Sequence, residues 1–87
     1  MKTEQECWDE FMRLIDLQRK YGNGNNCFLP TDSIQDRVMA FMDEMREAGL
    51  EENYQSTAYF RNWFFKCQGR LFSICKYSNG KMELRWG

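Results

Sequence analysis

The stretch Ser56-Thr57-Ala58-Tyr59-Phe60-Arg61-Asn62-Trp63-Phe64-Phe65-Lys66-Cys67-Gln68 decides the fold, because it is compatible with two secondary structures. On a helical wheel most of its aromatic side chains gather on one side, and its polar side chains share the other side with Phe65. Ser56 and Gly69 lie where the caps of such a helix belong. Read as a strand, the segment places aromatic residues on both faces, which suits a central strand. The segregation of the polar residues favours a helix over residues 56–68.

A β-hairpin is expected directly after this segment. Residues 71–77 and 82–86 have strand character, and Asn79-Gly80 between them suits a two-residue type I′ turn. That register sets Tyr77 opposite Met82, Cys75 opposite Leu84 and Ser73 opposite Trp86, and it pairs Lys76 with Glu83. If residues 56–68 form a strand instead, Gln68-Gly69 turns it into the hairpin and gives a three-stranded antiparallel meander.

Two amphipathic helices are expected before this segment. Thr3 and Glu6 form a capping-box pattern, and apolar residues then recur at helical spacing, which predicts a helix that ends near Tyr21. After the Gly/Asn-rich run 22–26, Thr31 offers an N-cap oxygen to a second helix, and Gly49 fits the position after its C-terminus. The sequence therefore predicts an α+β fold of three helices followed by a C-terminal β-hairpin, similar to a winged helix. The alternative is two helices packed on a three-stranded antiparallel β-meander.

Size and composition indicate a single folded domain over residues 1–87. The chain is 43% hydrophobic and 16% aromatic, which separates it from disordered sequences, and its length leaves room for one core. No apolar run approaches the roughly 20 residues that cross a bilayer, and the first residues are unlike a signal peptide, so we expect a cytoplasmic protein without membrane association. Free, buried thiols are expected at the four cysteines, Cys7, Cys27, Cys67 and Cys75.

Catalytic chemistry finds little support in the sequence. The chain has no histidine, which excludes histidine triads and imidazole acid–base catalysis. The cysteine spacing lacks paired C-x-x-C knuckles, and the adjacent carboxylates point in different directions on a helix. We therefore expect a non-catalytic binding domain with no metal and no cofactor.

Charge is divided unevenly along the chain. Residues 1–53 carry six basic and twelve acidic side chains, whereas residues 54–87 carry six basic side chains and Glu83 alone. A basic C-terminal part can attract a polyanion although the whole chain has a net charge of −1. The leading hypothesis is therefore DNA binding, with these candidate contact residues on the third helix and the hairpin: Arg61, Asn62, Lys66, Arg70, Lys76, Lys81 and Arg85.

Residues 59–73 resemble the second recognition helix of AraC-type transcription factors. The matching positions are Tyr59, Phe60, Phe64, Lys66, Gly69, Phe72 and Ser73. The resemblance implies a transcriptional regulator in which Arg61, Asn62 and Lys66 face DNA from a helix-turn-helix. The hairpin and the long stretch between Gly49 and Tyr59 depart from that family.

The alternative function is a protein-binding module. A small inhibitor or accessory factor of phage or plasmid type would use Tyr54, Phe65 and Trp86 as exposed anchors, because aromatic residues dominate protein interfaces. In a variant of this hypothesis, the acidic residues 1–53 imitate nucleic acid and occupy a basic groove of the target. A homodimer is left open.

Overall fold

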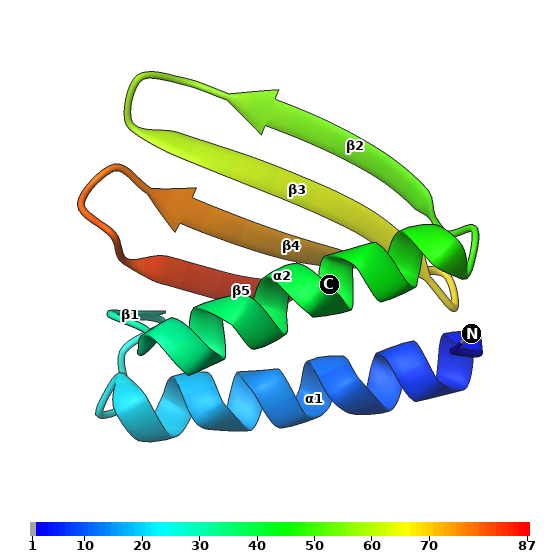
Figure 1. Cartoon of the computed structure of the whole chain (residues 1–87), viewed down its shortest axis with the longest axis horizontal. Coiled ribbons are helices and arrows are strands. Elements are labelled where there is room, and N and C mark those ends of the chain that lie inside the picture. Colours follow the sequence, from blue (N-terminus) through cyan, green and yellow to red (C-terminus); the bar gives the residue numbers. More distant parts are fainter. Residues whose placement is uncertain (1) are drawn as a thin grey trace.

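The computed structural model describes residues 2–87 and consists of two helices and a five-stranded antiparallel sheet (Figure 1). The helices are α1 (Glu4–Tyr21) and α2 (Asp32–Glu47), and the strands are β1 (Cys27–Phe28), β2 (Glu51–Ser56), β3 (Phe60–Cys67), β4 (Arg70–Tyr77) and β5 (Met82–Trp86). The strand order is β1-β5-β4-β3-β2. Both helices lie on one face of this sheet, so its other face is open (Figure 1).

The predicted first helix is confirmed with its cap. The Glu6 amide donates to Thr3 Oγ1 at 3.1 Å, and the Thr3 amide donates to Glu6 Oε1 at 3.0 Å. The buried residues of α1 recur every three or four positions and therefore form one stripe against the sheet: Cys7, Phe11, Leu14, Ile15 and Gln18. The helix ends at Tyr21, where the Gly/Asn-rich run begins.

The second helix also begins and ends at the expected signals. Thr31 Oγ1 accepts a hydrogen bond from the Ile34 amide, and Gly49 adopts a φ of +79°. The Leu50 amide donates to the Met45 carbonyl at 3.2 Å, and the Gly49 amide donates to the Arg46 carbonyl at 3.0 Å. These two bonds form a Schellman motif, which leads the chain directly from α2 into β2.

The prediction of a third helix over residues 56–68 is wrong. Residues 60–67 form β3, which pairs with β2 on one side and with β4 on the other. Gln68 and Gly69, with φ values of +52° and +75°, form a tight turn between β3 and β4 instead of a helix cap. The fold is therefore two helices on a five-stranded sheet, not three helices with a C-terminal hairpin. The meander alternative comes closer, but it lacks β1 and β2.

The expected hairpin exists with a different register. Lys76 lies opposite Met82, Cys75 opposite Glu83 and Ile74 opposite Leu84, one residue away from the predicted pairing. The Tyr77 amide donates to the Lys81 carbonyl and the Gly80 amide donates to the Tyr77 carbonyl, so the loop contains Ser78, Asn79 and Gly80. Only Gly80 in this loop has positive φ, whereas a type I′ turn needs it at Asn79 as well.

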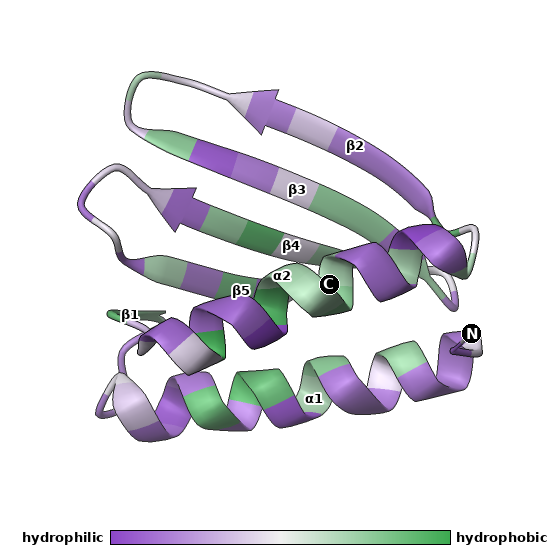
Figure 2. Cartoon of the chain, in the orientation of Figure 1, coloured by the Kyte–Doolittle hydropathy of each residue, from purple (hydrophilic) through white to green (hydrophobic). Residues whose placement is uncertain are grey.

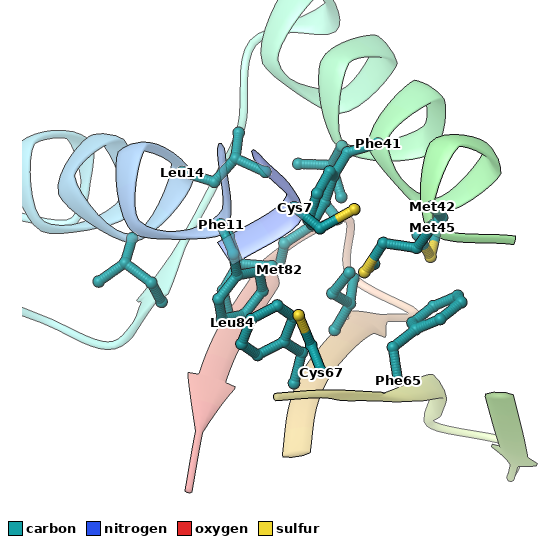
Figure 3. Close-up of a cluster of buried hydrophobic side chains, with 14 of the residues drawn as sticks. Cys7, Phe11, Leu14, Phe41, Met42, Met45, Phe65, Cys67, Met82 and Leu84 are labelled. Atoms are coloured by element: carbon teal, nitrogen blue, oxygen red, sulfur yellow. The ribbon is translucent and has the colours of Figure 1, made fainter. Parts of the chain in front are cut away.

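The hydrophobic core lies between the helices and the covered face of the sheet. Phe11 of α1 stacks on Phe72 of β4 with ring centroids 4.0 Å apart and packs against Phe41 of α2. Figure 3 shows Met42 and Met45 of α2 and Phe65 of β3 in the same cluster, and all three are fully buried. In Figure 2 hydrophobic residues occur on both helices and on β3, β4 and β5, while β2 at the far edge is mostly hydrophilic.

Candidate functional site

The strand conformation of residues 60–67 separates the residues that the DNA hypothesis brought together. Successive side chains of a strand point to opposite faces, so Asn62 and Lys66 lie on the open face and Arg61 lies on the helix-covered face. The same alternation, applied to β4 and β5 through their register with β3, places the basic residues of the hairpin on different faces. Arg85 lies on the open face, Arg70 and Lys76 lie on the covered face, and Lys81 precedes β5 in the loop. The expectation that Arg61, Asn62 and Lys66 share one helical surface is therefore wrong.

Several of these residues are engaged within the chain. Asn62 Oδ1 accepts a hydrogen bond from the Ser73 hydroxyl at 3.0 Å, and Arg85 pairs with Glu83 at 2.9 Å. The Arg70 guanidinium lies over the Trp86 ring, 5.4 Å from its centroid. These contacts leave fewer donors for a phosphate backbone than the sequence suggests.

The open face is balanced in charge and carries aromatic side chains. Within residues 2–87 its strand positions hold two acidic and two basic residues: Glu51, Glu83, Lys66 and Arg85. Phe60 and Phe64 of β3 and Tyr77 of β4 are half-buried there. The Tyr77 hydroxyl donates to Glu83 Oε1 at 2.9 Å, and this bond to a carboxylate raises the pKa of Tyr77. The charged strand positions of this face therefore cancel.

The three proposed protein-binding anchors lie in different environments. Phe65 is fully buried, and the Arg46 guanidinium of α2 lies 5.7 Å from its ring centroid. It is therefore not the exposed anchor that the sequence suggested. Trp86 is 42% exposed at the end of β5 and packs edge-on against Trp8. Tyr54 is 53% exposed on β2, with its ring centroid 5.4 Å from that of Trp63.

The outer edge of β2 is an exposed edge of the sheet. All six residues of β2 are exposed, and β2 is the last strand of the sheet on that side. The Thr57 amide donates to the Phe60 carbonyl at 2.9 Å, which fixes the alternation of hydrogen bonds along the β2–β3 pair. Asn53 and Gln55 therefore bond to β3. The amides and carbonyls of Glu52, Tyr54 and Ser56 point away from the sheet.

The opposite edge of the sheet is covered over Met82, Glu83 and Leu84. β1 pairs only with Met82 and Glu83. At Leu84, the next residue of β5, the Gln18 side chain makes the hydrogen bonds that a neighbouring strand would make. Gln18 Nε2 donates to the Leu84 carbonyl at 2.9 Å, and Gln18 Oε1 accepts from the Leu84 amide at 2.6 Å. Both main-chain groups of Leu84 are thereby satisfied, so this edge does not offer them to another chain.

An open depression of about 460 Å³ lies between the ends of the two hairpins. Its lining residues include Tyr59, Arg61 and Lys76, and none of them carries a carboxylate or a thiol. It therefore offers cations and hydroxyl groups but no acid–base pair. Across residues 2–87, no three cysteine or carboxylate side chains converge as metal ligands would.

No protein-family model, curated protein or solved structure matches this chain. Neither helix within residues 2–87 combines the length and apolar character needed to span a bilayer.

Sequence reasoning identified Tyr54 but missed the strand that carries it. Residues 51–56 read Glu-Glu-Asn-Tyr-Gln-Ser, without the apolar alternation that marks a half-buried strand. The useful signal was indirect, because Gln68-Gly69 suits a tight hairpin turn and thereby indicates that the residues before it are extended.

Proposed function

We propose that this chain is a non-catalytic protein-binding domain that adds an extended segment of a partner protein to the outer edge of β2. The observation that carries the proposal is the row of outward-facing main-chain groups at Glu52, Tyr54 and Ser56. An exposed edge with unpaired amides and carbonyls is a template for another strand, and main-chain hydrogen bonds supply much of the affinity in that mode of recognition.

The side chains next to this edge provide specificity. Tyr54 and Trp63 lie together on the helix-covered face and form an aromatic platform for a residue of the added strand. Glu52 at one end of β2 is held by Arg46, with atoms 2.9 Å apart, and Arg61 lies beside Ser56 at the other end. The edge thus has an acidic end and a basic end, which would orient an incoming strand of suitable charge.

The nucleic-acid hypothesis has less support. Its seven candidate residues are split between two faces and a loop, which does not fit a continuous phosphate backbone. The hypothesis of an acidic mimic is weakened by ion pairs within the acidic part, because Glu10 binds Arg37 at 2.9 Å and Asp43 binds Arg46 at 2.8 Å. A strand-binding edge requires neither a basic nor an acidic surface.

A proline substitution tests the edge selectively. Tyr54→Pro removes an amide that faces outward, whereas the hydrogen bonds between β2 and β3 come from Glu51, Asn53 and Gln55. Tyr54→Thr is the matched control, because it also removes the aromatic ring but keeps the amide. Peptides selected from a random library on the unsubstituted chain are then measured against both variants by calorimetry.

We expect the selected peptides to bind Tyr54→Thr more weakly than the unsubstituted chain and to lose binding to Tyr54→Pro. Amide hydrogen exchange should slow at Glu52, Tyr54 and Ser56 when the peptide binds. Equal binding to both variants would contradict strand addition at β2. Duplex DNA, added in a parallel titration, should show no salt-dependent binding, and a steep salt dependence would favour the nucleic-acid hypothesis instead.

A further inference from the structure

We infer that the strand which β2 accepts is β2 of a second copy of this chain, in an antiparallel homodimer with Tyr54 opposite Tyr54. This inference rests on the proposed function, since it names the partner of the same edge. A two-fold axis at Tyr54 would join the two sheets into one continuous sheet. Both pairs of helices would then lie on the same face of it.

The register follows from the positions of the outward-facing groups. With Tyr54 opposite Tyr54, Glu52 of each copy lies opposite Ser56 of the other, so all three outward-facing residues of both copies are paired. A shift of the axis to Asn53 leaves Ser56 opposite Leu50, outside β2. A shift to Glu52 sets Glu52 opposite Glu52, and like charges directly opposite are destabilising. A shift toward the other end leaves Glu52 without a β2 residue opposite. The register centred on Tyr54 is therefore the most favourable.

The side chains on the covered face agree with this register. Tyr54 already packs against Trp63, with ring centroids 5.4 Å apart. In the dimer the two tyrosines become cross-strand neighbours, which produces a row of Trp63, Tyr54, Tyr54 and Trp63 across the interface. Cross-strand aromatic pairs stabilise antiparallel sheets, and more than half of the Tyr54 surface is now exposed to solvent.

Charge complementarity gives an independent reason for a second copy. Arg61 is exposed and lies opposite Lys76 on β4, and no carboxylate within residues 2–87 forms an ion pair with it. In the proposed register Glu52 of the second copy lies opposite Ser56, which is itself opposite Arg61. The two charged residues are then two strand spacings apart, roughly 10 Å between their Cα atoms, which long side chains can bridge. The two-fold axis makes this contact twice.

The open face is also compatible with the dimer. Asn53 lies opposite Gln55 of the second copy, so their amide side chains can exchange hydrogen bonds. In Figure 1 β2 lies at the margin of the molecule. Its start adjoins the end of α2, where Arg46 binds Glu52, and the rest of the strand runs away from the helices. Neither face places like charges opposite each other.

The test is sedimentation equilibrium on the full chain, up to millimolar concentration. We expect a concentration-dependent dimer, and Tyr54→Pro should raise its dissociation constant at least about tenfold. Tyr54→Thr keeps the amide and should raise it less. The dispersion of amide chemical shifts in the NMR spectrum of each variant verifies that it is folded.

Charge variants test the register itself. Arg61→Glu should weaken the dimer because it places a second carboxylate on the same face as Glu52 of the other copy, two strands away. The double variant Arg61→Glu with Glu52→Arg should restore part of the loss. Lys76→Glu is the matched control, because it makes the same charge change one strand farther from the interface and should alter dimerisation much less. Equal effects of Arg61→Glu and Lys76→Glu, or no recovery in the double variant, would overturn the register.

Failure of the dimer and failure of the proposed function give different results. A chain that stays monomeric at millimolar concentration overturns the homodimer. If library peptides still lose binding to Tyr54→Pro, strand addition to β2 stands with another partner. A dimer that persists unchanged in Tyr54→Pro overturns the inference, because it forms through a different surface.

Discussion

Gln18 joins α1 to β5 through both ends of its side-chain amide, and replacing it by methionine should strongly destabilise the fold. Gln18 is 3% exposed, and its two hydrogen bonds to Leu84 measure 2.9 and 2.6 Å. Methionine has a similar length and supports a helix, but it cannot donate or accept these bonds. The substitution therefore leaves the amide and the carbonyl of Leu84 buried without partners.

The expected loss of stability follows from the Leu84 amide and carbonyl, which the substitution leaves without hydrogen-bond partners. An unsatisfied buried main-chain group costs about 1–3 kcal/mol, and the apolar gain from methionine offsets a small part of it. We expect the free energy of unfolding to fall by about 2–5 kcal/mol. A chain of 87 residues has a total of about 4–13 kcal/mol, so the variant should be near the limit of folding.

Urea denaturation followed by tryptophan fluorescence measures this difference. Gln5→Met is the matched control, because Gln5 lies on the same helix and forms only exposed hydrogen bonds with Asp9 and Gln68. It should change stability by less than about 0.5 kcal/mol. If Gln18→Met were as stable as Gln5→Met, the bonds to Leu84 would not contribute to closing the β5 edge.

Three further predictions concern other parts of the fold. A hydrogen bond from Arg37 lowers the pKa of Glu10. The ion pair therefore stabilises the fold above the ordinary pKa of 4.5, and this stabilisation is lost as the pH falls below that value. Arg37→Gln should weaken this dependence of the urea midpoint on acid pH. A thiol reagent at mildly alkaline pH should modify Cys27 before Cys67, because burial raises the pKa of Cys67 to about 11, and the reverse order would contradict the structure. Gly22→Ala should lower the melting temperature, because the added methyl group would lie 2.5 Å from the Asn25 carbonyl oxygen, whereas Gly87→Ala meets no atom within 4 Å and should have little effect.

Local signals predicted the helices of this fold because each has its own start and stop. The capping box of Thr3 and Glu6 and the Schellman glycine at Gly49 act within a few residues, so they are readable without tertiary information. The hairpin was recognisable for the same reason. Its register was not, since it depends on whether Asn79 adopts positive φ.

Residues 56–68 were misread because helical and strand periodicity both fit them. The polar residues gather on one side of a helical wheel, yet in β3 Asn62 and Lys66 face the open side and Arg61 faces the covered side. Aromatic residues occupy both faces: Phe65 lies in the core, and Phe60 and Phe64 are half-buried on the open face. The deciding interaction is the pairing with β2, whose sequence alone has no strand pattern.

For the candidate site, sequence composition indicated Tyr54 but not the edge on which it lies. Edge strands are usually protected by charges, proline or bulges, because unpaired main-chain groups attract other chains. In β2 the acidic residues, Glu51 and Glu52, stand only at its start. The segment from Asn53 to Ser56 has neither charge nor proline.

The contrast between the two edges of the sheet is the strongest argument that β2 is used for binding. At the β5 edge the chain buries a glutamine, at the entropic cost of fixing a long side chain, to satisfy one strand residue that β1 does not reach. An edge exposed merely because the chain is small would need similar protection to avoid aggregation. β2 lacks it over Tyr54 and Ser56 and instead places an exposed aromatic residue and an unpaired arginine, Arg61, beside the free amides. The features that would be a liability on an isolated edge are the ones that a specific added strand requires.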